Sequence, residues 1–258
     1  MKRIRISASL LILFSAFTGA LVLPSLVAAQ TGIWVPTGNM TTKHLYGTAT
    51  LLQSGKVLVA GGITTSDGRS TISTAELFDP TTGKWTRTAS MNVGRNSHTA
   101  TLMLDGRVLV AGGNDKTGNA LSSAEIYDPL LEQWTLTGTM NAPRATHAAA
   151  LIETGIDTGK VIVIAGSSQC ASCEPNLSTE IYDPSSAAWT KTADLHVARY
   201  YTLSNGTATI PDGSIMTVGG GTCCPYGEAN EERLTLRPQA VGHPQRRRSP
   251  GRTRRRRV

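Results

Sequence analysis

Short runs in which apolar and polar residues alternate fill the middle of the chain, and this period of two predicts β-strands rather than helices. Residues 99–104 and 107–111 are two such runs. The pair Asp105-Gly106 between them favours the positive φ angles of a tight hairpin turn. A third strand is expected at 124–127, and Trp134 opens a fourth. The pattern therefore predicts a unit of four antiparallel strands.

This unit is repeated with a period of about fifty residues, which indicates an array of stacked supersecondary units. Its second strand reads Gly-Lys-Val-Leu-Val-Ala-Gly-Gly at 55–62, Gly-Arg-Val-Leu-Val-Ala-Gly-Gly at 106–113, and more loosely the same at 159–166. The Val-Leu-Val-Ala run is apolar at successive positions, which suits a strand packed on both faces. Each copy is followed by Glu, an aromatic residue, Asp-Pro and a late tryptophan.

The ordered set of Gly-Gly, Tyr-Asp-Pro and a late tryptophan resembles the kelch repeat, over about residues 33–236. This resemblance implies an all-β fold, a kelch-type β-propeller in which each unit is one blade of four antiparallel strands. Three blades are complete, at about 44–91, 92–140 and 141–195. Kelch-like propellers usually have about six or seven blades. The chain supplies about four, so we expect either a four-blade ring or an open, partial propeller.

The fourth blade begins at Arg199 and offers residues 233–236 as its third strand. It lacks the tyrosine turn and the late tryptophan of the other blades. Residues 33–38 look like a fourth strand without the three that should precede it, and Trp34 lies 51 residues before Trp85. Pairing this segment with residues 233–236 would close the ring and remove exposed strand edges.

The two ends of the chain differ in composition from the predicted propeller domain, residues 31–236. Residues 1–29 begin with basic residues, continue with an uncharged apolar stretch and end with small residues, which predicts a secretory signal peptide or, alternatively, an uncleaved anchor. Residues 237–258 form a basic tail, predicted to be disordered or to be an out-of-frame end. The net charge of +7 comes from these ends, and the acidic remainder argues against a nucleic-acid partner.

Repetition separates residues that build blades from residues that are free to bind a ligand. We interpret residues that recur in every blade as structural: Trp34, Trp85, Trp134, Trp189, Asp79, Asp128, Asp183, Glu76, Glu125 and Glu180. The arginine and histidine at the entry to the innermost strand recur in two blades. They either form hydrogen bonds between blades or contact a ligand at the channel mouth.

The loop after the second strand and the link between blades should open on the same face, because successive strands run in opposite directions. Variable loops on one face of a repeat scaffold are typical binding sites. We therefore predict a ligand-binding rim there, with carbohydrate or protein as the ligand. Its candidate residues are His44, Tyr46, Arg95, His98, Arg144, His147, Arg199, Tyr200 and Tyr201.

All four cysteines fall in loops of this rim. Cys170 and Cys173 lie in one loop, and Cys223 and Cys224 lie in the matching loop of the next blade. In an exported protein this arrangement predicts disulfides, although four cysteines allow three pairings. A four-thiolate zinc site is the alternative. The expected location is secreted, periplasmic or at the cell surface, with no resident cofactor and no stable membrane insertion after cleavage.

A second resemblance suggests an enzyme. Residues 197–201, 211–215 and 218–220 look like the propeller of galactose oxidase and glyoxal oxidase. That likeness implies copper and a cysteine-crosslinked tyrosine radical, with Tyr201 as the tyrosine. The partner cysteine expected around 147–149 is missing, and the copper ligands would lie beyond Leu236, where no counterpart exists. We therefore expect a binding module without catalytic residues or, as the alternative, a truncated and inactive relative of these copper oxidases.

Overall fold

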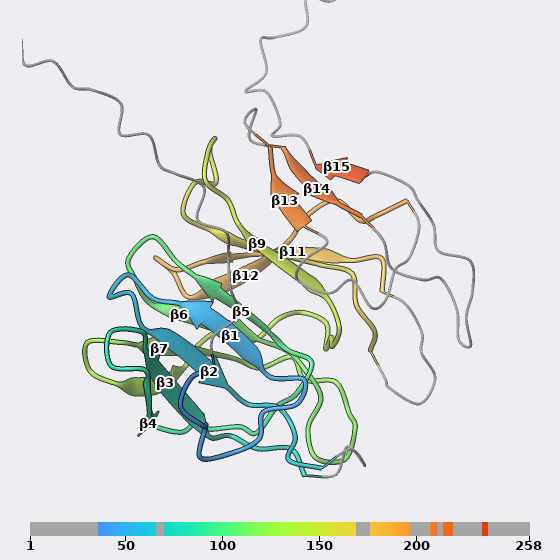
Figure 1. Ribbon diagram of the computed structural model, residues 1–258. Coiled ribbons are helices and arrows are strands. Elements are labelled where there is room, and N and C mark those ends of the chain that lie inside the picture. The colour runs from blue at the N-terminus through green and yellow to red at the C-terminus, as the bar shows by residue number, and fades with distance from the viewer. Residues whose placement is uncertain are drawn as a thin grey trace, which may run out of the picture. The chain divides into compact units, whose positions relative to one another are not determined.

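The computed structural model describes residues 36–65, 70–168, 176–196, 207–210, 214–218 and 234–236 (Figure 1). These residues form antiparallel β-sheets within the compact unit Thr37–Val258, and no helix occurs among them. The described residues accordingly contain no helix that could cross a membrane. The predicted signal peptide, Trp34 and the basic tail lie outside the described residues.

The strands form four sheets, which we call blades 1 to 4. Blade 1 contains β1 (Thr48–Leu51), β2 (Val57–Ala60), β3 (Ala75–Asp79) and β4 (Lys84–Thr88). Blade 2 contains β5 (Thr99–Leu102), β6 (Val108–Ala111), β7 (Ala124–Asp128) and β8 (Gln133–Leu136). Blade 3 contains β9 (Ala148–Leu151), β10 (Val161–Ile164), β11 (Thr179–Asp183) and β12 (Ala188–Lys191). Blade 4 contains β13 (Thr207–Thr209), β14 (Ile215–Thr217) and β15 (Leu234–Leu236).

The predicted strands are confirmed, with small shifts at their ends. β5 stops at Leu102 because the chain then turns, and the Gly106 amide donates to the Met103 carbonyl at 3.0 Å. Gly106 has a φ of 85°, as the Asp-Gly turn requires. In blade 4, β15 pairs with β14 as the expected third strand. All-β blades of four antiparallel strands agree with the predicted kelch-type propeller.

Consecutive blades pack face to face, and the innermost strands β1, β5, β9 and β13 are neighbours in this order (Figure 1). Alternate side chains of β6 enter two different cores: Val108 and Val110 pack with blade 1, and Leu109 and Ala111 pack with blade 3. This explains the uninterrupted apolar run of the second strand. Each buried Val or Leu contributes roughly 1.5–3 kcal/mol to the folded state.

Aromatic residues of the third and fourth strands tie blades 2 and 3 to the blade before them. The Tyr127 hydroxyl shares a hydrogen bond of 2.7 Å with Thr88 Oγ1 of blade 1. The Trp134 indole packs against the Tyr127 ring, and its Nε1 donates to the Ala89 carbonyl at 2.8 Å. Blade 3 repeats both contacts onto blade 2. These contacts explain why the tryptophan and tyrosine recur.

Candidate functional site

Each blade carries two kinds of loop, one at each end of its strands. At one end, which we call the rim face, the link between blades meets the loop after the second strand through isolated bridges such as Asn96↔Asn114 and Ala145↔Ser167. At the other end, which we call the hairpin face, lie the turn after the first strand and the Asp-Pro turn. The bridges confirm that the links and the second-strand loops open on the same face.

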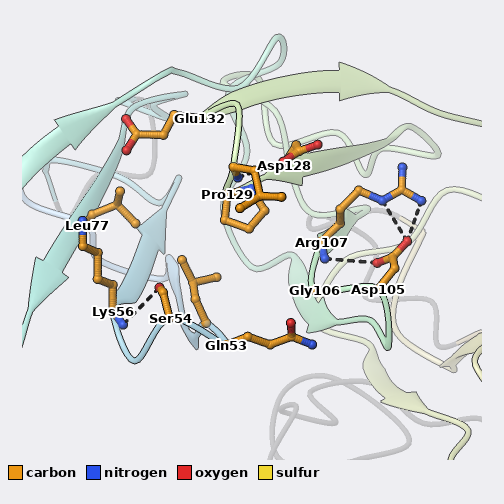
Figure 2. A pocket seen from close by; sticks show the side chains of 12 residues that line it. Gln53, Ser54, Lys56, Leu77, Asp105, Gly106, Arg107, Asp128, Pro129 and Glu132 are labelled. Atoms are coloured by element: carbon orange, nitrogen blue, oxygen red, sulfur yellow. Dashed lines mark hydrogen bonds and ion pairs between the residues drawn. The ribbon is translucent and has the colours of Figure 1, made fainter.

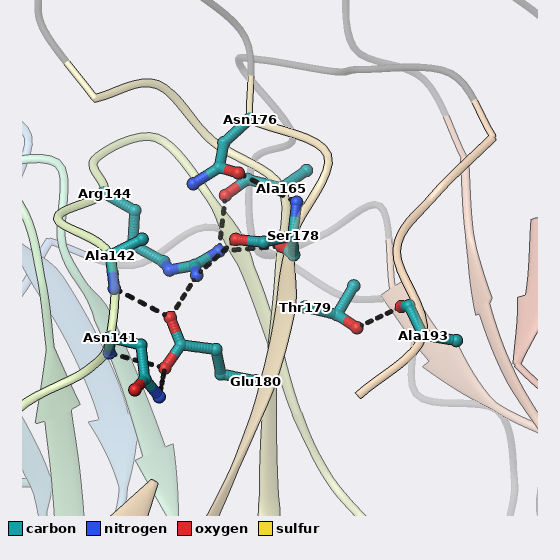
Figure 3. A network of polar contacts seen from close by, with 9 residues as sticks. All are labelled: Asn141, Ala142, Arg144, Ala165, Asn176, Ser178, Thr179, Glu180 and Ala193. Carbon is teal, nitrogen blue, oxygen red and sulfur yellow. Dashed lines mark hydrogen bonds and ion pairs between the residues drawn. The ribbon is translucent and has the colours of Figure 1, made fainter. Parts of the chain in front are cut away.

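Two of the three arginines predicted at the rim, Arg95 and Arg144, are fully buried, and each anchors a link onto the sheet that follows it. Arg144 Nη2 donates to Glu180 Oε1 at 2.6 Å, and its Nη1 donates to the Ala165 and Ser178 carbonyls at 3.0 and 2.9 Å (Figure 3). Arg95 repeats the pairing with Glu125 at 2.8 Å. Burial lowers the pKa of Arg144, and its partner Glu180 acts in the opposite direction.

The glutamates that pair with these arginines also accept hydrogen bonds from backbone amides of the link between blades. Glu180 accepts hydrogen bonds from the Asn141 and Ala142 amides at 2.7 and 3.1 Å (Figure 3). Burial raises the pKa of Glu180, but these hydrogen bonds and Arg144 outweigh burial, so the pKa lies below its ordinary value. An ionised carboxylate is therefore satisfied on all sides, which accounts for the recurrence of this glutamate in the blades.

The two histidines are buried in equivalent places. His98 Nε2 and Thr48 Oγ1 are hydrogen-bonded at 3.0 Å, and His147 Nε2 and Thr99 Oγ1 at 2.9 Å. Burial, with the positive charge of Arg95, lowers the pKa of His98 to about 3. Burial and Arg144 likewise hold the pKa of His147 well below its ordinary value. Both imidazoles are therefore neutral at physiological pH.

The Gly-Gly pair of one blade and the arginine and histidine of the next fit together. A Cβ on Gly61 would lie 2.7 Å from His98 Cε1 and 2.5 Å from the Arg95 carbonyl oxygen. A Cβ on Gly112 would collide with Arg144 and His147 in the same way. The motif elements recur together because each one supports the contact between two blades.

Blade 1 departs from this pattern at the position of the arginine. His44 occupies it, with Nδ1 donating to the Gly61 carbonyl at 2.7 Å and Nε2 lying 3.4 Å from Glu76 Oε1. Its side chain is almost fully buried. Two residues later, Tyr46 is 70% exposed. Its carbonyl accepts the Ser97 amide at 2.9 Å, which fixes the backbone under this aromatic ring.

The structure thus divides the predicted rim residues into two groups. Arg95, Arg144, His98 and His147 lie between blades. His44 is buried against its own blade, where it contacts Gly61 and Glu76, and Tyr46 reaches solvent. Arg199, Tyr200, Tyr201 and the four cysteines lie outside the described residues, and their roles stay predictions. Among the described residues, no three His, Cys, Asp or Glu side chains form a group that could hold a metal ion.

The hairpin face carries the Asp-Pro turns. The aspartate of each turn accepts a hydrogen bond from the amide two residues later, as Asp128 Oδ1 does from Leu130 at 2.8 Å and Asp183 Oδ1 from Ser185 at 2.9 Å. Hydrogen bonds from Ser185 and, to a lesser extent, Lys160 lower the pKa of Asp183 to about 2. These contacts support the structural interpretation of the aspartates.

A cavity of about 300 Å³ lies between blades 1 and 2 on the hairpin face. Leu77 contributes an apolar wall, the ion pair of Arg107 with Asp105 lies on the other side, and Pro129 lines the cavity between them (Figure 2). Leu130 also lines it. A cavity of about 320 Å³ occupies the equivalent place between blades 2 and 3.

Blade 2 breaks the repeat beside the first cavity. Leu130 and Leu131 follow its Asp-Pro, where blade 1 has two threonines and blade 3 has two serines. They are 93% and 65% exposed, and we call them the leucine pair. The sequence pattern did not single them out, although the departure from Thr81-Thr82 and Ser185-Ser186 is a signal that could have found them.

Comparison with known proteins identifies the repeat. Residues 44–92 and 95–141 each match the kelch motif. The F-box/kelch-repeat protein SKIP30 of Arabidopsis thaliana is 36% identical over 77 residues, which are 30% of this chain. The match spans about a fifth of that relative, 21% of its length. The two kelch motifs cover blades 1 and 2.

Proposed function

Because this chain contains kelch repeats, which generally mediate protein–protein interaction, we propose that it is an interaction module that binds another protein through the hairpin face of blade 2. The observation that carries the proposal is the leucine pair, which stands exposed beside a cavity with apolar walls. Exposed apolar side chains next to a concave surface are typical of protein-binding sites.

The turn presents the leucine pair in a fixed conformation. Asp128 Oδ1 accepts the amides of both Leu130 and Leu131, at 2.8 and 3.2 Å. A partner that covers these side chains gains binding free energy of roughly 25 cal/mol per Å² of apolar surface buried. Because the turn is already fixed, binding costs little additional conformational entropy of its backbone. Lys56 and Glu132, which also line the cavity, supply charges that can orient the partner.

A double variant tests this proposal, because Leu130→Ser with Leu131→Ser reproduces the turn of blade 3 and should leave folding intact. The immobilised chain is incubated with extracellular proteins, the captured protein is identified by mass spectrometry, and its affinity is measured by calorimetry. We expect about tenfold or greater loss of affinity in the double variant. Thr81→Ser with Thr82→Ser in blade 1 is the matched control and should bind normally. Equal binding by the double variant would contradict the proposal.

A carbohydrate ligand at the rim face is the second candidate function, and the exposed Tyr46 favours it. An exposed aromatic ring on a fixed backbone is suited to packing against the apolar side of a sugar ring. A glycan array that compares the wild-type chain with Tyr46→Ala decides this question. Retention of one glycan class by the wild type and its loss in Tyr46→Ala would support the sugar ligand. A wild-type chain that retains no glycan would refute it.

We also propose that the module acts outside the cytoplasm and carries disulfides, from the sequence of residues 1–29 and the cysteines at 170, 173, 223 and 224. Intact mass spectrometry of the exported chain tests both points. The expected chain begins at Gln30 and contains no free thiol. A chain that retains residues 1–29 and has four free thiols would contradict both points.

A further inference from the structure

The contacts between blades are directional. We call the side of a sheet that meets the preceding blade its leading face and the side that meets the following blade its trailing face. In the first contact, Leu58 and Leu77 on the trailing face of blade 1 share a core with Val108 and Tyr127 on the leading face of blade 2. Blades 2 and 3 repeat this core, and Ile215 of blade 4 joins a third one with blade 3.

The leading face of blade 1 carries the same type of surface, but no described residue covers it fully. Val57 and Phe78 pair with each other as Val108 and Tyr127 do in blade 2. Val108 and Tyr127 are fully buried, whereas Val57 and Phe78 are only half-buried. Leu51, at the end of the innermost strand, is 63% exposed. Among the described residues, this face is therefore an apolar sheet surface that no neighbouring sheet covers.

The trailing face of blade 4 is the complementary surface. Met216 and Val218 take the positions that Leu109 and Ala111 hold in blade 2, counted from the Gly-Gly that follows. Leu109 and Ala111 are buried against blade 3, but Met216 is half-buried and Val218 is 43% exposed. Ile215, on the other side of the same strand, is buried against blade 3.

Thr41 and Thr42, just ahead of blade 1, make the same backbone contacts as the equivalent residues inside the array. The amides of Thr41 and Thr42 both donate to Glu76 at 2.8 Å, as the amides of Asn92 and Val93 donate to Glu125. A sheet that packs on the leading face of blade 1 would therefore contact a link whose backbone amides already donate to the glutamate, as they do between blades 1 and 2.

We propose that a second copy of this chain covers both surfaces. The trailing face of blade 4 in each copy packs on the leading face of blade 1 in the other, and two such contacts close a two-fold symmetric ring. The contact repeats the one that the chain already makes between its own successive blades. It buries Leu51 and Val218, which the single chain leaves exposed.

Sedimentation equilibrium of the purified chain tests this arrangement. We expect twice the mass of one chain. Leu51→Glu and Val218→Glu each place a charge in one half of the contact, and each should weaken self-association at least about tenfold. Leu136→Glu is the matched control, because Leu136 is 56% exposed but belongs to the outer strand of blade 2. Circular dichroism confirms that all three variants are folded.

Mixing the two variants separates this contact from other forms of association. A pair of one Leu51→Glu copy and one Val218→Glu copy contains one undamaged contact, so a complex should reappear that neither variant forms alone. A wild-type monomer, a mass that grows without limit, or a dimer that Leu51→Glu leaves intact would each overturn the proposal. Because the leucine pair lies on neither of these two faces, binding of a partner protein can be measured on the monomeric variants independently.

Discussion

At the scale of single residues, the charged and titratable side chains at the entry of each blade serve the contact between sheets. Arg144 illustrates this role, since its guanidinium reaches Glu180 and two backbone carbonyls from a fully buried position. Such a buried cation is tolerated because Glu180 and the carbonyls of Ala165 and Ser178 accept hydrogen bonds from its two terminal nitrogens. Substitutions that remove one partner should therefore cost far more than similar changes on the surface.

Replacing Arg144 with methionine leaves Glu180 buried without its cation. We expect the free energy of unfolding to fall by about 3–5 kcal/mol, measured by urea denaturation with tryptophan fluorescence. Arg107→Met is the control, because Arg107 pairs with Asp105 at 2.6 Å in a partly exposed position. That change should cost at most about 1 kcal/mol. Equal costs for the two variants would show that the buried pair does not anchor the blade.

The buried histidines make stability depend on pH. The pKa of His98 lies at about 3 in the folded chain, against an ordinary value of 6.5. Between these values the unfolded chain binds more protons, so stability is full above pH 6.5 and falls as the pH drops toward 3. Each such histidine contributes up to about 1.4 kcal/mol per pH unit.

Urea denaturation between pH 5 and 7 measures this slope, above the range in which the carboxylates titrate. The double variant His98→Gln with His147→Gln should have a flatter dependence of unfolding free energy on pH than the wild type. An identical slope in both proteins would contradict the assignment of the pH dependence to these two residues.

At the scale of strands and turns, most of the structure follows from local sequence. Residues 99–104 and 107–111 could be assigned as strands because their alternation and the Asp-Gly turn are local signals, and β5 and β6 occupy these places. The burial of Arg95 could not be assigned, because it depends on the fit between one blade and the next. The leucine pair could have been found by comparing the residues after the three Asp-Pro pairs, but two apolar residues alone do not show that they face solvent.

The Gly-Gly element gives a test at this scale. Gly112 and Gly83 have nearly equal φ angles, 62° and 66°, but a Cβ on Gly112 would meet Arg144 and His147, whereas a Cβ on Gly83 would meet no atom within 4 Å. Gly83→Ala should cost about 1–2 kcal/mol for the left-handed conformation alone. Gly112→Ala should cost at least about 2 kcal/mol more, in thermal or urea unfolding. Similar costs would show that the packing between blades is loose at this point.

At the scale of the whole molecule, the described residues form a row of β-propeller blades, and the first two match the kelch motif. The rim face of blades 2 and 3 carries many of the contacts that hold the row together. The kelch motifs at 44–92 and 95–141 cover blades 1 and 2. The hairpin face is under less constraint, since its turns accept Thr-Thr, Leu-Leu or Ser-Ser after the same Asp-Pro. Substitutions in the turns of the hairpin face are therefore possible without loss of the fold. A surface of this kind is where a repeat protein can acquire a binding partner.

Site-specific photocrosslinking tests the central claim, that this kelch array binds a protein through blade 2, most directly. A photoreactive phenylalanine is placed at Leu130 or, as the control, at the equivalent Ser185 of blade 3, and each chain is irradiated in the presence of extracellular proteins. We expect one discrete protein adduct from position 130 and none from position 185. Adducts of equal yield at both positions, or an adduct formed only from a probe at Tyr46 on the rim face, would contradict the account.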